Sequence, residues 1–112
     1  MRMYEIEVYR TATDEAPFQA WIESLRDQKA QTRLYARLDR ASYGNFGDWK
    51  DLTGAKGLFE MRDHYGQGFR IYYSIVGSRI ILLLAGSTKS EQNRAIMKAK
   101  EYLADYFRRT SS

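Results

Sequence analysis

Apolar and polar residues alternate at the start of the chain, between Met3 and Tyr9. Tyr4, Ile6 and Val8 occupy every second position, and glutamates stand between them. A period of two is typical of a strand that buries one face. The pattern therefore predicts a half-buried β-strand over this stretch.

Two amphipathic helices are predicted after this strand. Asp14 is in position to cap the first helix, and Pro17 is tolerated in a first turn. The apolar residues that follow recur at i, i+3, i+4 and i+7, namely Phe18, Trp21, Ile22 and Leu25. The second helix is predicted from after Asp27 to about Tyr43, with helically spaced Ala30, Leu34, Leu38 and Ala41 on its apolar face.

The middle of the chain is typical of a loop followed by three strands. Residues 44–57 are rich in turn formers and predict a loop that its aromatic side chains anchor. Strands are expected over 58–63, 69–76 and 79–85, with glycine-containing turns between them. Gly77 and Ser78 suit a two-residue hairpin turn.

A last helix is predicted after Gly86. Thr88 and Glu91 have the spacing of a capping box, and the apolar residues beyond them fall on one helical face, namely Ile96, Ala99, Leu103 and Phe107. The tail over 109–112 is expected to fray. The resulting order, β-α-α-β-β-β-α, groups its strands, which favours an α+β fold with an antiparallel central sheet. One domain over 1–112 is expected, because no repeat or linker interrupts the chain.

The composition excludes several kinds of chemistry. Cysteine is absent and histidine occurs once, which excludes thiol nucleophiles, disulfides and zinc sites built from both residue types. No carboxylate pair for Mg²⁺ is evident, so neither a metal nor a cofactor is expected. The longest apolar run, 80–85, is far shorter than the roughly 20 residues of a membrane helix. Without a signal-peptide pattern at the start, we expect a cytoplasmic protein with no membrane contact.

The positive charge is concentrated in the second half of the chain. There are 18 basic and 14 acidic residues, which gives a formal charge of +4. Residues 1–56 carry 9 basic and 9 acidic side chains, whereas residues 57–112 carry 9 and 5. An anionic partner such as nucleic acid would therefore dock on the second half, although a solvated basic surface without a ligand has the same signature.

Three cations are predicted to converge on one face of the sheet. A hairpin centred on Gly66 places Arg62 directly opposite Arg70, where like charges repel. The two-residue turn would place Arg70 across from about Ala85, so that Lys89 emerges near the same end of the sheet. Such an arrangement favours a bound phosphate.

Other interpretations of these residues stay open. Glu60 and Asp63 would neutralise the two arginines if all four form ion pairs, and Lys89 would then be solvated. His64, in the same turn, is a second candidate because its unperturbed pKa lies near neutrality, although a lone turn histidine is usually a surface residue. If the protein cuts RNA, the substrate's own 2′-hydroxyl would attack, and the protein would position it and stabilise charge.

A further set of side chains is expected to bind RNA around this phosphate site. Tyr72 shares the predicted face of Arg70 and is a candidate for base stacking. The remaining candidates are basic or aromatic residues in the loop and the last helix, namely Lys50, Lys56, Lys98 and Tyr102. Solvated lysines and core tyrosines are the alternative interpretation of this set.

Four blocks of the sequence carry a resemblance to a known family. They are Gly44-Asn45-Phe46-Gly47-Asp48-Trp49-Lys50, Gly57-Leu58-Phe59-Glu60-Met61-Arg62, Gly66-Gln67-Gly68-Phe69-Arg70-Ile71-Tyr72-Tyr73 and Gly86-Ser87-Thr88-Lys89-Ser90-Glu91-Gln92. Together they resemble the addiction-module killer branch of the RelE/ParE toxin superfamily, close to HigB-type proteins. The similarity covers nearly the whole chain, and it implies a RelE-like fold.

This resemblance implies a type II toxin that cleaves mRNA on the translating ribosome. A cognate antitoxin, of the helix-turn-helix kind, would hold it inactive. Arg70 matches the arginine assigned to transition-state charge, Arg62 the arginine that ends the preceding strand, and Lys89 the basic residue after the last strand. The catalytic tyrosine or histidine that some members carry near the end of the chain has no clean match. A ParE-like inhibitor of DNA gyrase and a non-catalytic RNA-binding module are the alternatives.

Overall fold

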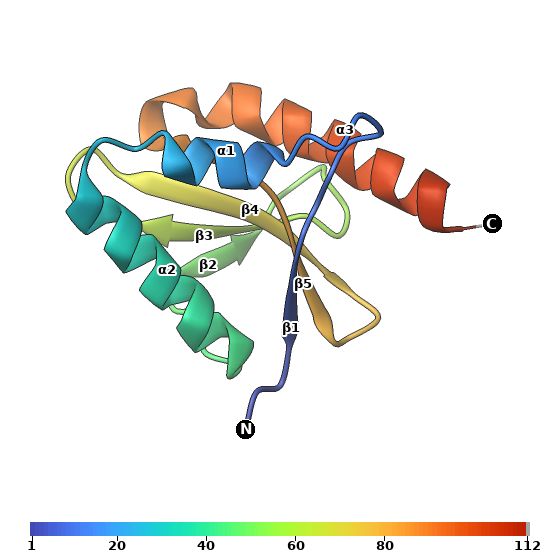
Figure 1. Cartoon of the computed structure of the whole chain (residues 1–112), viewed down its shortest axis with the longest axis horizontal. Helices are drawn as coiled ribbons and strands as arrows, with labels where there is room; N and C mark the ends of the chain where they lie inside the picture. Colours follow the sequence, from blue (N-terminus) through green and yellow to red (C-terminus); the bar gives the residue numbers. More distant parts are fainter. Residues whose placement is uncertain (112) are drawn as a thin grey trace.

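A computed structural model describes residues 1–111 and contains a five-stranded mixed sheet with helices on both faces (Figure 1). The strands are β1 (Glu5–Val8), β2 (Trp49–Asp51), β3 (Phe59–Asp63), β4 (Phe69–Val76) and β5 (Ile80–Thr88). The helices are α1 (Pro17–Glu23), α2 (Gln28–Ser42) and α3 (Gln92–Thr110), with a 3₁₀ turn, η1 (Lys89–Glu91), before α3. This architecture confirms the predicted α+β class.

The strand order is β1-β5-β4-β3-β2, and β1 runs parallel to β5 while all other neighbours are antiparallel. Each face of the sheet has its own apolar core. Helices α1 and α2 cover one face, and their core includes Phe18, Ile22, Leu34, Leu38, Met61, Ile71, Tyr73, Ile81 and Leu83. Helix α3 covers the other, with Leu58, Tyr72, Leu82, Leu84, Ala99 and Leu103. In the described part of the chain, no helix is both long and apolar enough to cross a bilayer.

The first helix begins differently from the prediction. Asp14 does not cap α1; its φ of 65° places it in a turn, where it accepts from Arg10. Helix α1 starts at Pro17, whose ring sets the φ that a first turn requires. Asp27 caps α2 by accepting hydrogen bonds from the N–H groups of Lys29 and Ala30.

A short strand interrupts the segment that the sequence predicts to be a loop. Trp49–Asp51 forms β2, which pairs with β3 in antiparallel register, with Trp49 opposite Met61, Lys50 opposite Glu60 and Asp51 opposite Phe59. The prediction of an uninterrupted loop was wrong because a strand of three residues is too short to show an alternation of apolar and polar positions. Their strand conformation comes from the pairing with β3.

The β4–β5 hairpin also differs from its predicted register. Three residues, rather than two, separate the paired Val76 and Ile80. A bulge shifts the pairing again between Tyr72 and Tyr73, and β5 continues to Thr88. Arg70 therefore lies opposite Ser87 and not near Ala85.

The final helix lacks the predicted capping box. The hydroxyl of Thr88 contacts the side chains of Ser90 and Glu91, and it caps no backbone N–H. The predicted fraying of the tail was wrong for the described residues, since α3 continues to Thr110 and Arg109 donates to Asp105 at 2.9 Å. Ser112 lies outside the described residues.

Close packing between α1 and β5 depends on one glycine. A Cβ at Gly86 would lie 2.1 Å from the ring of Trp21. We therefore expect Gly86→Ala to cost about 1–3 kcal/mol in the free energy of unfolding, because the indole must move. Urea unfolding measures this cost, and a cycle with Trp21→Leu isolates the contact. If Gly86→Ala costs the same unfolding free energy in the wild-type and in the Trp21→Leu background, the contact with the indole is not the cause.

A buried carboxylate ties β3 to α2. Asp63 accepts the Tyr65 N–H at 2.9 Å and lies 3.1 Å from Arg33 and 3.9 Å from Arg37. Burial raises the pKa of Asp63, but the Tyr65 N–H and the two guanidinium groups outweigh it, so the pKa lies below its usual value. A lowered pKa stabilises the fold above the unfolded value of about 3.9, and this stability is lost as the pH falls.

We expect Asp63→Asn to cost about 1–3 kcal/mol of unfolding free energy near neutral pH. The difference from wild type should shrink as the pH falls below about 4, where both chains lose the ion pair. Urea unfolding at several pH values measures both effects. Asp39→Asn is the matched control because the Asp39–Arg2 pair is exposed. A cost for Asp63→Asn no larger than the control's would contradict the prediction.

Candidate functional site

The β3–β4 hairpin places Arg62 directly opposite Arg70, as predicted. Ser87 of β5 continues this cross-strand row beyond Arg70. The neighbouring row on the same face contains Lys50, Glu60, Tyr72 and Ala85. One carboxylate therefore lies among the cations of this sheet face.

Glu60 is the carboxylate shared by the two arginines. Its side chain is buried and accepts a hydrogen bond from Arg62 Nε at 2.8 Å, and Arg70 Nε lies 3.7 Å from the same oxygen, Oε1. The hydrogen bond to Glu60 raises the pKa of Arg62. Glu60 therefore neutralises the two arginines in part, as the alternative to a bound phosphate expected. Asp63, the other carboxylate of that alternative, pairs with Arg33 of α2 instead.

Arg70 is buried without full hydrogen bonding. Its exposed fraction is 4%, and its Nη1 donates to the Phe69 carbonyl at 3.2 Å. Its Nε is buried and has no hydrogen-bond partner among residues 1–111. A buried guanidinium with a free donor is costly unless a further acceptor arrives. Helix α3 also packs on this face, so the face that holds the arginines contains an apolar core as well.

The stem of Lys89 lies near Gly68 and Arg70, at the predicted end of the sheet. Its backbone N–H donates to the Gly68 carbonyl at 3.1 Å. A Cβ at Gly68 would lie 3.2 Å from Lys89 Cβ and 3.8 Å from Arg70 Nη1. The absence of a side chain at Gly68 thus lets the lysine stem and the guanidinium approach each other. Lys89 itself is exposed.

Tyr72 is not available for base stacking in this structure. The ring has 0% exposure and its hydroxyl lies 3.0 Å from Ser87 Oγ. Burial raises the pKa of Tyr72 to about 12, so the phenol is neutral at physiological pH. The prediction overlooked α3, which covers this part of the arginine face with Ala99 and Leu103.

The other predicted RNA-binding residues lie at three separate places. Lys50 is exposed beside Glu60 on the arginine face. Lys56 lines a different hollow with Lys100, near the start of β3 and away from Arg62. Lys98 and Tyr102 line a groove between α1, β5 and α3, whose other residues include Trp21 and Arg94. Trp21 and Arg94 were missed because only the packing of α1 and α3 on the two faces of β5 brings them to one groove.

His64 pairs with a carboxylate close to the arginine pair. Its Nε2 donates to Asp48 Oδ2 at 2.8 Å, and the imidazole is mostly exposed. This hydrogen bond lowers the pKa of Asp48 despite some opposing desolvation, and the charge of Arg62 lowers it further. The pair therefore lies at the rim of the arginine cluster, and both side chains remain accessible.

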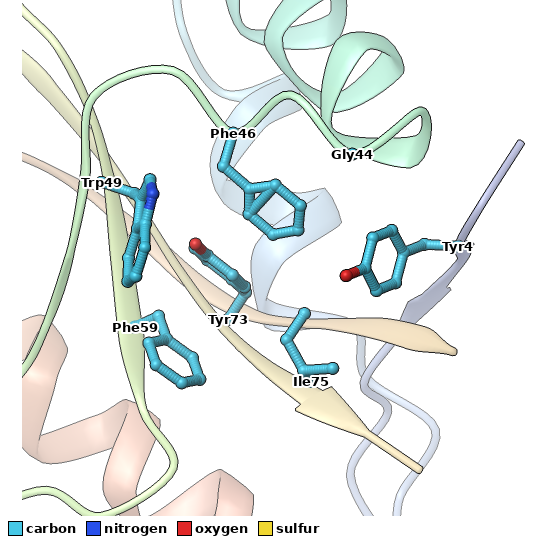
Figure 2. Close-up of a pocket in the computed structure, with 7 residues that line it drawn as sticks. All are labelled: Tyr4, Gly44, Phe46, Trp49, Phe59, Tyr73 and Ile75. Carbon is cyan, nitrogen blue, oxygen red and sulfur yellow. The ribbon is translucent and has the colours of Figure 1, made fainter. Parts of the chain in front are cut away.

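An aromatic cavity lies on the opposite face of the sheet. Figure 2 shows its lining residues, Tyr4, Gly44, Phe46, Trp49, Phe59, Tyr73 and Ile75. Its volume is about 300 Å³. Neighbouring rings pack against one another, for example Phe46 and Tyr73 with centroids 5.6 Å apart. None of the predicted site residues lines this cavity.

Comparison with known proteins places the chain in a family. No protein-family model matches it. A protein of Haemophilus influenzae described as "Uncharacterized protein" is 37% identical over 83 residues, which cover 74% of this chain and 82% of the relative. In residues 1–111, no three His, Cys, Asp or Glu side chains cluster to form a metal site. The chain belongs to the same family as this H. influenzae protein.

Proposed function

We propose that this chain is a toxin of the RelE/ParE superfamily, an mRNA endoribonuclease that acts on the translating ribosome. A cognate antitoxin would inhibit it. The observation that carries the proposal is that Arg62 and Arg70 share a single carboxylate, Glu60, while the stem of Lys89 lies beside Gly68 and next to Arg70. Two arginines that share one buried carboxylate, with a lysine stem beside them, leave positive charge where a phosphodiester would bind.

The chemistry needs neither a metal nor a cofactor. The substrate's 2′-hydroxyl would attack the adjacent phosphorus, and the bond to the 5′-oxygen of the next nucleotide would break, which leaves a cyclic phosphate. Arg70 would stabilise the negative charge that develops on the phosphate oxygens, because a guanidinium has five N–H donors and Arg70 makes one side-chain hydrogen bond among the described residues, from Nη1 to the Phe69 carbonyl. Arg62 and Lys89 would bind the phosphate from the two sides of this guanidinium.

Proton transfer is the step of the cleavage reaction to which the side chains of the arginine cluster contribute least. Tyr72 is buried and neutral, and a guanidinium holds its proton tightly. We therefore propose that the decoding site of the ribosome supplies the orientation that completes the reaction. Purified protein would then cut free mRNA poorly.

The test is to induce the protein in a bacterium and map mRNA ends. Cleavage within translated reading frames is expected for wild type, and it should be retained in Arg79→Ala, a control in the turn between β4 and β5. DNA supercoiling and strand breaks are measured in the same cells. Gyrase-linked breaks without mRNA cleavage would replace the proposal with the ParE-like function. Comparable cleavage of naked and ribosome-bound mRNA by purified protein would overturn ribosome dependence.

A further inference from the structure

The groove between α1, β5 and α3 exists because β5 is longer than its neighbour. Strand β1 pairs with β5 only from Ile80 to Leu83, and β5 continues to Thr88. Helices α1 and α3 pack on opposite faces of the sheet and both flank this extension of β5. The result is a groove of about 210 Å³ with Ala85, Gly86 and Ser87 among its lining residues.

Two aromatic side chains line this groove. Trp21 comes from α1 and stays partly exposed, although it packs against Gly86 and lies 6.5 Å from the Phe69 ring. Tyr102 comes from α3 and stacks on Tyr9, with ring centroids 5.1 Å apart. These contacts hold both rings in place before any ligand arrives, and fixed rings are suited to stacking on nucleobases.

The charge of the groove favours an anionic chain. Arg94 and Lys98 line it from α3, against one acidic residue, Glu91. Lys98 also lies 3.7 Å from Glu101, but both side chains are exposed, so this pair is weak and easily exchanged for a phosphate. Two cations between two aromatic rings match the pattern of single-stranded nucleic acid sites.

The groove is continuous with the arginine cluster. Ser87 lines the groove and is also the cross-strand partner of Arg70. A single-stranded RNA whose phosphate lies at Arg70 would therefore enter the groove within a short distance along β5. An acidic peptide would satisfy Arg94 and Lys98, but it gives no reason for the two rings.

We propose that this groove binds the RNA nucleotides next to the scissile phosphate. The proposal rests on the function proposed above. Trp21 and Tyr102 stack on bases, and Arg94 and Lys98 contact backbone phosphates. Base stacking tolerates every base, so the groove holds the substrate without selecting a sequence.

The test uses an oligoribonucleotide that cannot be cut, with every 2′-hydroxyl methylated. The chain has two tryptophans, Trp21 in the groove and Trp49 in the aromatic cavity. Trp49→Phe leaves Trp21 as the only emitter, and Trp21→Phe leaves Trp49. The oligonucleotide is expected to quench Trp21 emission and to leave Trp49 emission unchanged. In the wild-type chain, a photoreactive iodouridine in the oligonucleotide should crosslink to the peptide of Trp21 or Tyr102.

Substitutions on α3 test the charge contacts. Arg94→Ala and Lys98→Ala are each expected to weaken binding several-fold and to reduce the slope of log K against log salt by about one. Lys100→Ala is the matched control, because Lys100 lies on the same helix but lines another hollow. Equal losses for all three variants would overturn the proposal. Unchanged Trp21 emission together with no crosslink in the groove would also overturn it.

The outcomes separate this inference from the proposed nuclease. If the oligonucleotide quenches Trp21 but ribosome-bound mRNA is not cut, the nuclease fails and the groove stands. If mRNA is cut while Arg94→Ala and Lys98→Ala bind as tightly as wild type, the groove fails alone. Stronger quenching by a hexaglutamate peptide than by the oligonucleotide would show that the groove binds acidic protein segments instead.

Discussion

Replacing Arg70 by alanine is expected to reduce cleavage of ribosome-bound mRNA by a factor on the order of 10²–10³. The guanidinium is held in place by the ion pair of its Nε with Glu60 and by the hydrogen bond of its Nη1 to the Phe69 carbonyl, which is its one side-chain hydrogen bond among the described residues. A preorganised donor of this kind stabilises the transition state more than the ground state. Cells should therefore tolerate Arg70→Ala, and Arg70→Lys should restore activity only in part, because an ammonium lacks the planar fork of donors.

Burial of Arg70 requires a folding control for this experiment. Its 4% exposure means that removal of the side chain leaves buried space beside Gly68 and also leaves Glu60 with one cation fewer. Thermal unfolding and capture by the antitoxin show whether the variant is native. A folded Arg70→Ala protein that cuts mRNA as fast as Arg79→Ala would refute the phosphate-site proposal.

Glu60→Gln is expected to be the most destabilising single substitution at the site, at about 3–5 kcal/mol of unfolding free energy. The carboxylate is 1% exposed and is the shared partner of two guanidinium groups that face each other across the hairpin. Glutamine keeps an oxygen acceptor for Arg62 but removes the negative charge. Arg70 then remains buried beside Arg62 without a counter-ion.

Urea unfolding of Glu60→Gln measures the loss, with Glu101→Gln as the control. Glu101 pairs with Lys98 on the surface, so its substitution should change stability by less than about 0.5 kcal/mol. Inorganic phosphate should stabilise Glu60→Gln more than wild type, because an anion can replace the missing carboxylate between the arginines. Equal stabilisation of both proteins by phosphate would contradict this account.

The facing arginines could be predicted because local rules determine them. The segment between Arg62 and Arg70 is short and contains Gly66 and Gly68, both with positive φ, so the hairpin has one accessible register. Residue parity then assigns each side chain to a face. The helices were predictable for a similar reason, since a period of 3.6 extends over many residues in α2 and α3.

The register between β4 and β5 could not be read in the same way. Gly77 and Ser78 both have positive φ, as in a two-residue turn, yet Arg79 also lies outside the paired strands. The bulge at Tyr72 then adds a second shift that no residue pattern marks. Arg70 consequently faces Ser87, and this difference connects it to the groove.

Burial on the arginine face depends on contacts between distant segments. Tyr72 alternates with Ile71 and Tyr73 as a surface residue would, but Leu103 of α3 belongs to the same core as Tyr72. The groove is likewise formed by residues from 17 to 102, which share no local motif. Their convergence follows from tertiary packing, and single-sequence periodicity contains no information about it.

The parallel pairing of β1 with β5 sets the order in which the protein can be completed during its own synthesis. Glu5 pairs with Ile80, so β1 has no partner until β5 has also emerged from the ribosome. The β3–β4 hairpin, by contrast, joins neighbours and can form as soon as it is translated. The arginine pair is therefore assembled before β1 can join the sheet, because β1 must wait for the synthesis of β5.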